Sequence, residues 1–279
     1  PPANRLSRGV WMLDYFTNQA SGLIGLAAQP GPRMMAVVSH SDEQAELPLL
    51  WQLCQALVTF GCAVTVLDAT TRESESNPGL LQLLEHSRWS GDEDCQPGAW
   101  TVLPAAAGIQ SLCASPLQQS QIFGQLSRLL PKGSIVILYC KAEWMIPIIG
   151  DSAIEPLLAV SPMRNSLLTS YLALKRLLIT GKLKPTIVNM IPDSLSASST
   201  NSQSISASLS ECVKRFLGHD IKVVDITEQH IEEPRHGDTH HLVLRLLESA
   251  MALNADGPPE VNCVHLSDFR RVDRFAGSH

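Results

Sequence analysis

The residues in this sequence whose types are most suited to chemistry form one polar stretch, Ser39-His40-Ser41-Asp42-Glu43-Gln44-Ala45-Glu46-Leu47. A phosphate-binding loop needs glycines for close backbone approach, a lysine for the phosphates and a Ser or Thr for Mg²⁺. This stretch has no glycine and no lysine, it ends in Leu47, and it carries three carboxylates. One like charge at contact distance costs about 4 kcal/mol at an effective dielectric of roughly 20. A helix N-terminus offers only about 1 kcal/mol, so we expect a disabled phosphate site.

A strand–helix–strand unit positions this stretch. The apolar run 34–38 predicts a buried strand, and 39–46 predicts the loop at its carboxyl end. Pro48 suits the first turn of a helix that ends at Gly61. A second strand, 63–67, places Asp68 at its tip. In such units ligands lie at the carboxyl ends of the strands, over the helix N-terminus.

Other candidate catalytic groups are sparse. The apolar run 134–138 predicts a strand at the centre of the sheet. In a P-loop ATPase this strand ends in the Asp that orders Mg²⁺, whereas here Tyr139, Cys140 and Lys141 follow. No spacing supports a Ser–His–Asp set, a Cys–His set or paired carboxylates, so we expect no catalytic residues.

Histidines near the C-terminus offer a weak metal motif. His236 and His240 stand at helical i, i+4 spacing, with His241 beside them. However, Gly237 weakens that helix, and no third ligand has a fixed spacing. We therefore expect solvated histidines and no metal.

The remaining chain alternates strand and helix patterns. We predict strands at 100–103, 153–160, 185–190 and 221–224, and helices at 79–86, 116–130, 165–178 and 241–253. The Ser-rich run 195–210 is either a mobile loop or the start of a helix that continues to 217. This alternation predicts an α/β fold with a doubly wound, mostly parallel sheet flanked by helices. We divide the chain into a helical arm (1–30), a single domain (31–253) and a polar tail (254–279).

Composition narrows the function classes. The 279 residues are 44% hydrophobic and 17% charged, which is typical of a globular protein. A net charge of −6 argues against a nucleic-acid binder. Seven scattered cysteines without a CxxC pair indicate free thiols in a reducing compartment. No apolar run reaches the roughly 18 residues that a membrane span needs. We therefore expect a cytoplasmic protein.

Five stretches carry a resemblance to a known family. The segment 18–23 (NQASGL) looks like a DQAxGLR partner motif, and 37–53 falls on a strand–SGKGGVGKTT–helix. The segment 66–70 (VLDAT) is similar to a strand ending in LDAD. Segments 161–175 and 187–190 follow a PEPTSxTDAYxxxK helix and a VVNM strand. Over residues 15–230 this order resembles the MinD/ParA family of deviant P-loop ATPases, and most of all the FlhG/FleN-type flagellar-number regulators.

The resemblance assigns roles to individual residues. It implies a P-loop NTPase-like fold of MinD type with degenerate nucleotide-binding motifs. Ser41 and Glu46 replace the two lysines of the nucleotide motif, and Leu47 replaces the Mg²⁺ hydroxyl. The implied vestigial nucleotide site is Ser39, Ser41, Glu46, Leu47, Asp68 and Asn189, of which the Asn usually reads adenine. The implied partner-binding residues are Asn18, Gln19, Gly22 and Leu23, which contact an FlhF-type GTPase in the family.

These observations favour a protein that is not an enzyme, a pseudo-ATPase. We expect a regulator or scaffold in the assembly, number or polar placement of a bacterial surface machine, and the flagellum is the first candidate for that machine. Its partners would be proteins or a second copy bound without ATP, not nucleic acid or membrane. ATP and ADP are not expected as cofactors, although a base could still bind through Asn189. Two alternatives stay open: an ATPase with a rebuilt site that uses Lys141 or Lys175, and a cellulose-secretion or pilus accessory protein.

The N-terminal arm also leaves two interpretations open. Trp11, Tyr15, Phe16 and Leu23 recur at helical spacings within residues 1–30. Such an apolar arm either packs on its own domain or docks on a partner.

Overall fold

A computed structural model describes residues 31–86, 100–150, 152–192, 200–227 and 237–253. The predicted N-terminal arm and C-terminal tail lie outside these residues, and with them the partner motif Asn18, Gln19, Gly22 and Leu23.

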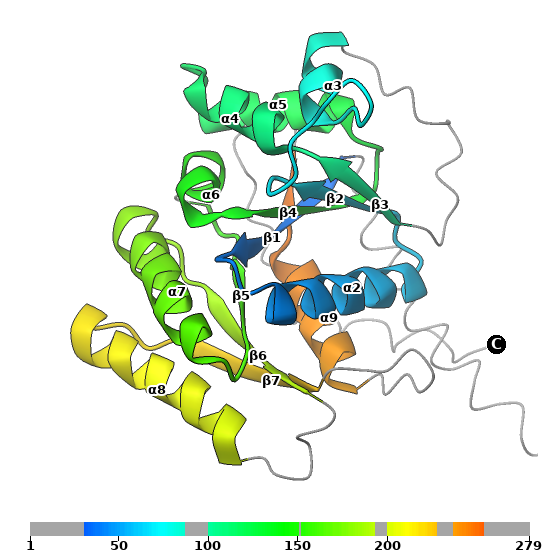
Figure 1. Ribbon diagram of the computed structural model, residues 1–279. Coiled ribbons are helices and arrows are strands. Elements are labelled where there is room, and N and C mark those ends of the chain that lie inside the picture. The colour runs from blue at the N-terminus through cyan, green and yellow to red at the C-terminus, as the bar shows by residue number, and fades with distance from the viewer. Residues whose placement is uncertain (1–30, 87–99, 151, 193–199, 228–236, 254–279) are drawn as a thin grey trace, which may run out of the picture.

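The described chain alternates strands and helices (Figure 1). In chain order the elements are β1 (Arg33–Ser39), α2 (Glu43–Thr59), β2 (Val64–Asp68), α3 (Leu80–His86), β3 (Trp100–Pro104), α4 (Ala106–Ala114), α5 (Gln119–Leu129), β4 (Ile135–Lys141), α6 (Ala142–Ile149), β5 (Leu157–Val160), α7 (Arg164–Lys175), the π-helical turn η1 (Arg176–Thr180), β6 (Thr186–Ile191), α8 (Thr200–Leu217), β7 (Lys222–Thr227), α9 (Gly237–Ser249) and β8 (Met251–Ala252).

One sheet organises these elements. Its strand order is β3-β2-β4-β1-β5-β6-β7, all parallel, and β8 pairs antiparallel with the start of β1. The predicted doubly wound, mostly parallel sheet flanked by helices is thus confirmed. The central strand is β1, with β4 beside it rather than at the centre as the sequence suggested.

Helices cover both faces of the sheet, and the side chains of β1 divide between two apolar clusters. Met34, Ala36 and Val38 join the cluster that includes residues of α3–α8. Met35 and Val37 join the cluster under α2 and α9. Figure 1 shows α2 and α9 side by side, and α6, α7 and α8 beyond the sheet from them. This alternation is the period-two pattern of a strand buried on both faces.

Two boundary errors affect the site. The sequence placed residues 39–46 in a loop and Pro48 in the first helical turn. Instead α2 begins at Glu43, and Pro48 lies inside the helix. The second error concerns β4, which extends through Tyr139 and Cys140 to Lys141, so Tyr139 is a buried strand residue.

Elsewhere the elements exist but their ends differ from the prediction. The structure contains α4 and α6, which the sequence interpretation missed, and β5 covers only the last four residues of the predicted 153–160 strand. Of the two interpretations of the Ser-rich run, the structure favours helix, since α8 begins at Thr200. Within the described part of the chain, no helix combines the length and apolarity needed to span a bilayer.

Candidate functional site

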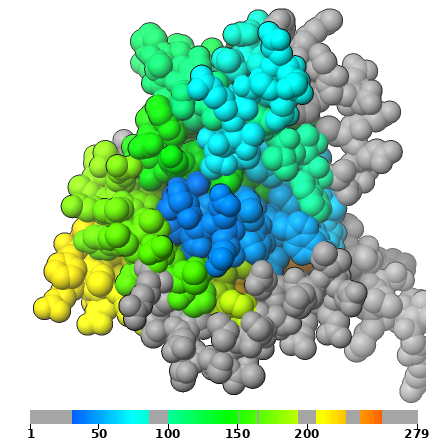
Figure 2. Space-filling model, viewed as in Figure 1, coloured from blue at the N-terminus to red at the C-terminus, as the bar shows by residue number. Residues whose placement is uncertain are grey.

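The segment 39–47 connects β1 to the first turn of α2. Its backbone turns sharply at Ser41, whose φ of 73° lies in the left-handed region that favours glycine. Asp42 is the N-cap residue of α2, and its carbonyl accepts hydrogen bonds from the amides of Ala45 and Glu46. In the space-filling view the start of α2 lies at the middle of the visible face, between α3 and α7 (Figure 2). The segment therefore lies at the carboxyl edge of the sheet, as expected.

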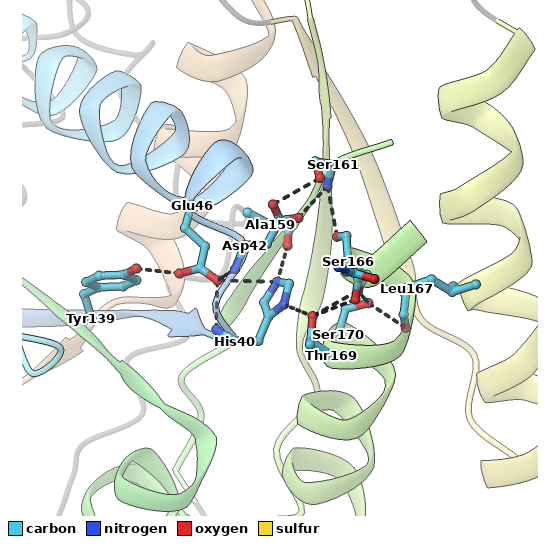
Figure 3. Close-up of polar contacts among 11 residues, drawn as sticks. His40, Asp42, Glu46, Tyr139, Ala159, Ser161, Ser166, Leu167, Thr169 and Ser170 are labelled. Carbon is cyan, nitrogen blue, oxygen red and sulfur yellow. Dashed lines mark hydrogen bonds and ion pairs between the residues drawn. The ribbon is translucent and has the colours of Figure 1, made fainter. Parts of the chain in front are cut away.

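Glu46 points back into this segment. Its side chain is fully buried, and its Oε1 accepts hydrogen bonds from the backbone N–H of His40 (2.8 Å) and of Asp42 (2.9 Å). Its Oε2 accepts a hydrogen bond from the hydroxyl of Tyr139 on β4 (Figure 3). Two backbone amides of the segment 39–47 thus donate hydrogen bonds to a carboxylate of the chain itself.

Tyr139 completes the surroundings of that carboxylate. Burial raises the pKa of its phenol well above the ordinary value, and the hydrogen bond to Glu46 raises it further. A hydrogen bond with Ser39 acts in the opposite direction. Because the phenol stays protonated, it remains a hydrogen-bond donor to Glu46.

His40 connects the same segment to β5 and α7. Its Nε2 lies 2.7 Å from the carbonyl oxygen of Ala159, and its Nδ1 lies 2.9 Å from Oγ1 of Thr169 (Figure 3). Since a carbonyl only accepts, Nε2 carries a proton. The Nε2–Oε1 distance to Glu46 is 3.6 Å, which adds an ion pair whenever the ring is charged.

Asp42 makes a second connection to α7. Its Oδ2 accepts a hydrogen bond from the backbone N–H of Ser161, and its Oδ1 accepts one from the Ser161 hydroxyl, both at 3.0 Å. The Ser161 amide also lies 3.2 Å from Oγ of Ser166 (Figure 3). The segment 39–47 and the N-terminus of α7 are therefore held together by buried polar contacts.

The expected cluster of three repelling carboxylates is thus only partly right. Asp42 and Glu46 are buried and hydrogen-bonded within the chain, and only Glu43 is exposed. Ser41 is also exposed, and Leu47 is 52% exposed on the outside of α2. Two of the three carboxylates are therefore satisfied within the chain, and repulsion by exposed charge is left to Glu43.

Asp68 lies near Tyr139, but its carboxylate is hydrogen-bonded to residues of its own loop. Its Oδ1 accepts hydrogen bonds from the amide and hydroxyl of Thr70, and its Oδ2 accepts one from the hydroxyl of Thr71. It is in register with Tyr139 on the neighbouring strand. Lys141 is exposed and in register with Ser39.

Asn189 lies elsewhere on the sheet edge. It is 1% exposed on β6, and its Nδ2 donates a 2.8 Å hydrogen bond to Oδ1 of Asp225 on β7. The structure thus brings together Ser39, Glu46 and Asp68 around Tyr139, with Asn189 two strands away from β1.

Sequence reasoning missed His40, Asp42, Tyr139, Ser161 and Thr169 as members of this network. Asp42 and Glu46 stand at i, i+4 spacing, which places them on one face of a helical turn. That spacing was the available signal, but the late predicted start of the helix concealed it. Among the described residues, no group of His, Cys, Asp and Glu side chains is placed to hold a metal.

Comparisons with known proteins identify the fold. The sequence matches no family model and no curated protein. Among solved structures, apo McdA from Cyanothece matches with a TM-score of 0.53 and 15% identity, covering 77% of this chain and 99% of that one. An ATP complex of a Cyanothece McdA variant matches with a TM-score of 0.51 and 15% identity, covering 78% and 97%. The chain therefore has the fold of the McdA structures.

A third similar structure is the Pyrococcus furiosus cell division ATPase MinD, with 14% identity and a TM-score of 0.46 over 78% of this chain and 97% of that chain. These comparisons correct one expectation. The prediction that the chain is not an enzyme is contradicted, because a McdA variant that shares its fold was solved as a complex with ATP. At such identity the likeness concerns the fold alone.

Proposed function

We propose that this protein is a MinD/ParA-type regulator that acts through protein partners in the assembly or placement of a bacterial surface machine. The observation that carries the proposal is the Glu46 carboxylate, which occupies two backbone amides of the segment 39–47. The segment connects β1 to α2, but two backbone amides that could bind an anion already donate hydrogen bonds to Glu46. We therefore propose that its role does not depend on a triphosphate at this position.

The energetics of displacement support this proposal. A phosphate entering the segment would have to remove Glu46 from two amides and from the Tyr139 hydroxyl. Hydrogen bonds to a charged group contribute about 1.5–3 kcal/mol each. The displaced carboxylate would also remain close to the phosphate and repel it by about 4 kcal/mol at an effective dielectric of roughly 20. We accordingly propose that neither ATP nor ADP is a resident cofactor.

The proposed partners follow from the sequence resemblance. We propose an FlhF-type GTPase or another component of the machine, with the flagellum first and a cellulose-secretion or pilus system as the alternative. A second copy bound without ATP is a further proposed partner, and nucleic acid is not. A pull-down with Leu23→Asp and Gln19→Ala tests the N-terminal contact. Unchanged capture of the GTPase would remove residues 18–23 as the interface.

The nucleotide proposal is tested by calorimetric titration with ATP, ADP and GTP in the presence of Mg²⁺. We expect no heat of binding at millimolar nucleotide for the wild-type protein. The Glu46→Ala variant, with Glu43→Gln as its exposed control, shows whether freeing the amides creates an anion site. Micromolar binding of ATP to the wild-type protein would refute the proposal.

A second candidate function is an ATPase with a rebuilt site. The structural similarity to an ATP-bound McdA variant favours it, and so does the exposed Lys141 beside the segment 39–47. The other suggested lysine, Lys175, ends α7, six residues or roughly 9 Å beyond Thr169 along the helix. Measuring phosphate release from ATP by the Lys141→Ala variant and by the control variant Lys132→Ala distinguishes the ATPase from the regulator that does not depend on a triphosphate. Hydrolysis that depends on Lys141 alone would establish the ATPase.

A further inference from the structure

The outer side of α7 and η1 carries aliphatic side chains that the core does not use. Leu168 is 63% exposed, Leu172 is 52% exposed and Ile179 is 56% exposed. Leu168 and Leu172 are one helical turn apart on the same side, and Ile179 follows seven residues later. The exposed Lys175 lies between them. We name Leu168, Leu172, Lys175 and Ile179 the α7 ridge.

The fold does not require this ridge. The inner side of the same helix is anchored by Leu174 and Leu177, both fully buried in the apolar cluster. Tyr171 and Leu167 pack against that cluster from the flank. An amphipathic helix normally presents polar residues outward, so a row of half-exposed aliphatic side chains indicates a surface that contacts something else.

The charge around the ridge restricts what that contact is. Residues 161–190 contain five basic residues and no acidic one, in a chain of net charge −6. Lys175 and Lys184 are exposed, whereas Arg176 makes a 3.1 Å ion pair with Glu143 on α6. The ridge is therefore an apolar strip that contains the exposed Lys175 and is followed in the chain by the exposed Lys184, and these cations complement an acidic partner.

We propose that the α7 ridge docks an acidic amphipathic helix of a protein partner, with its apolar side on Leu168, Leu172 and Ile179. The proposal rests on the proposed role as a protein-binding regulator, but it concerns a different surface from the segment 39–47. The spacing of the ridge supports a helix, because Leu168, Leu172 and Ile179 follow one another at intervals of four and seven residues, which match the repeat of a packed helical partner.

The flanking helices argue against an anionic lipid surface. The segment formed by α7 and η1 contacts α6 and α8 (Figure 1). These neighbours present the exposed Glu143 and Glu211. A flat anionic surface would meet both carboxylates, whereas a single helix lying along α7 meets only the ridge and its lysine. A nucleic acid would gain no favourable contact by covering the leucines of the α7 ridge.

The test uses a synthetic helical peptide with leucines at i, i+4 and i+7 and glutamates on both sides of them. The control peptide carries lysines in place of the glutamates. We expect fluorescence anisotropy to show binding of the acidic peptide to the full chain. Leu168→Asp and Leu172→Asp should each weaken it roughly tenfold or more. Val102→Asp, at a 55% exposed position on β3, is the matched control and should bind normally.

Three results would overturn the proposal. They are equal affinity for both peptides, binding unaffected by Leu168→Asp, and Leu168-dependent binding to phosphatidylglycerol vesicles without binding to the acidic peptide. Circular dichroism checks that each variant is folded. Titrating the same preparations with Mg-ATP keeps the two proposals distinguishable, because nucleotide binding would refute the role proposed for the segment 39–47 without altering the peptide result.

Discussion

Glu46 illustrates how its surroundings determine what a residue does. A carboxylate at the position of a phosphate-binding lysine suggests repulsion of any phosphate, and this was the interpretation from sequence. In the folded chain the same carboxylate accepts hydrogen bonds from two amides and one phenol. Its oxygens are thus hydrogen-bonded within the chain, at the start of α2.

The first prediction concerns this carboxylate. Glu46→Gln should lower the free energy of unfolding by about 1–3 kcal/mol, because it removes the charge from three buried hydrogen bonds and places an amide donor among donors. Urea denaturation measures the change. The control Glu43→Gln lies on the same helical turn but is exposed, and it should change stability by no more than about 0.5 kcal/mol. Equal effects of the two variants would contradict the prediction.

The second prediction concerns Tyr139 and alkaline pH. Burial and the contact with Glu46 raise the pKa of its phenol in the folded state above the ordinary value of 10.0. A raised pKa means that the stabilisation is fully present below about pH 10 and declines as the pH rises through the folded-state pKa. Tyr139→Phe cannot ionise, so its stability should decline less steeply above pH 10 than that of the wild-type protein.

Urea midpoints measured between pH 8 and pH 11 test this difference. Tyr171→Phe serves as a control for a tyrosine outside the network. Parallel curves for wild-type and Tyr139→Phe proteins would show that the phenol contributes nothing to the pH dependence.

At the scale of elements, carboxylates of the chain satisfy the amides at several helix starts. Glu73 accepts hydrogen bonds from the amides of Leu81, Ala107 and Gly108, at the starts of α3 and α4. Glu46 does the same for the turn before α2, and Asp42 for the turn before α7. Helix N-termini attract anions, and these internal anions fix the loops at the carboxyl edge of the sheet.

The third prediction follows from the contact between Asp42 and Ser161. Asp42→Asn should weaken the connection between the segment 39–47 and α7 by about 1.4 kcal/mol or more, because one of two acceptor oxygens becomes a donor. The amides of residues 161–166 should then exchange with solvent roughly tenfold faster. Mass spectrometry after hydrogen–deuterium exchange measures this rate. The control Asp220→Asn removes only an exposed ion pair, and an equal acceleration in it would refute the prediction.

At the scale of the whole molecule, one sheet supports both apolar clusters. Neighbouring residues of β4 enter opposite layers, since Leu138 belongs to the cluster of α3–α8 and Ile137 to the cluster of α2 and α9. Both side chains are fully buried. The two layers are therefore coupled through the backbone of the central strands.

The fourth prediction tests that coupling. Leu138→Ala and Ile137→Ala should each lower the free energy of unfolding by about 2–5 kcal/mol, because each leaves a cavity in a close-packed layer. In urea both variants should keep a single transition by circular dichroism and by tryptophan fluorescence. Separate transitions for the two probes would show that the layers unfold independently.

The sequence by itself determined the class of fold and the order along the chain of the seven parallel strands that the structure describes, although α4 and α6 were missed. Apolar β-branched runs such as 34–38 and 134–138 bury on both faces only in a parallel sheet covered by helices. The absence of glycine and lysine in 39–47 likewise followed from local residue types. These features depend on periodicity and composition within short windows, which is why they could be predicted.

Only the tertiary structure decided what the polar residues of 39–47 do. The Glu46 side chain meets Tyr139, 93 positions away in the chain, and Asp42 meets Ser161, 119 positions away. No local pattern encodes these contacts, because they arise when β1, β4 and β5 pair side by side. The direction of a buried carboxylate depends on donors supplied by that pairing, so sequence reasoning found the charges but not their partners.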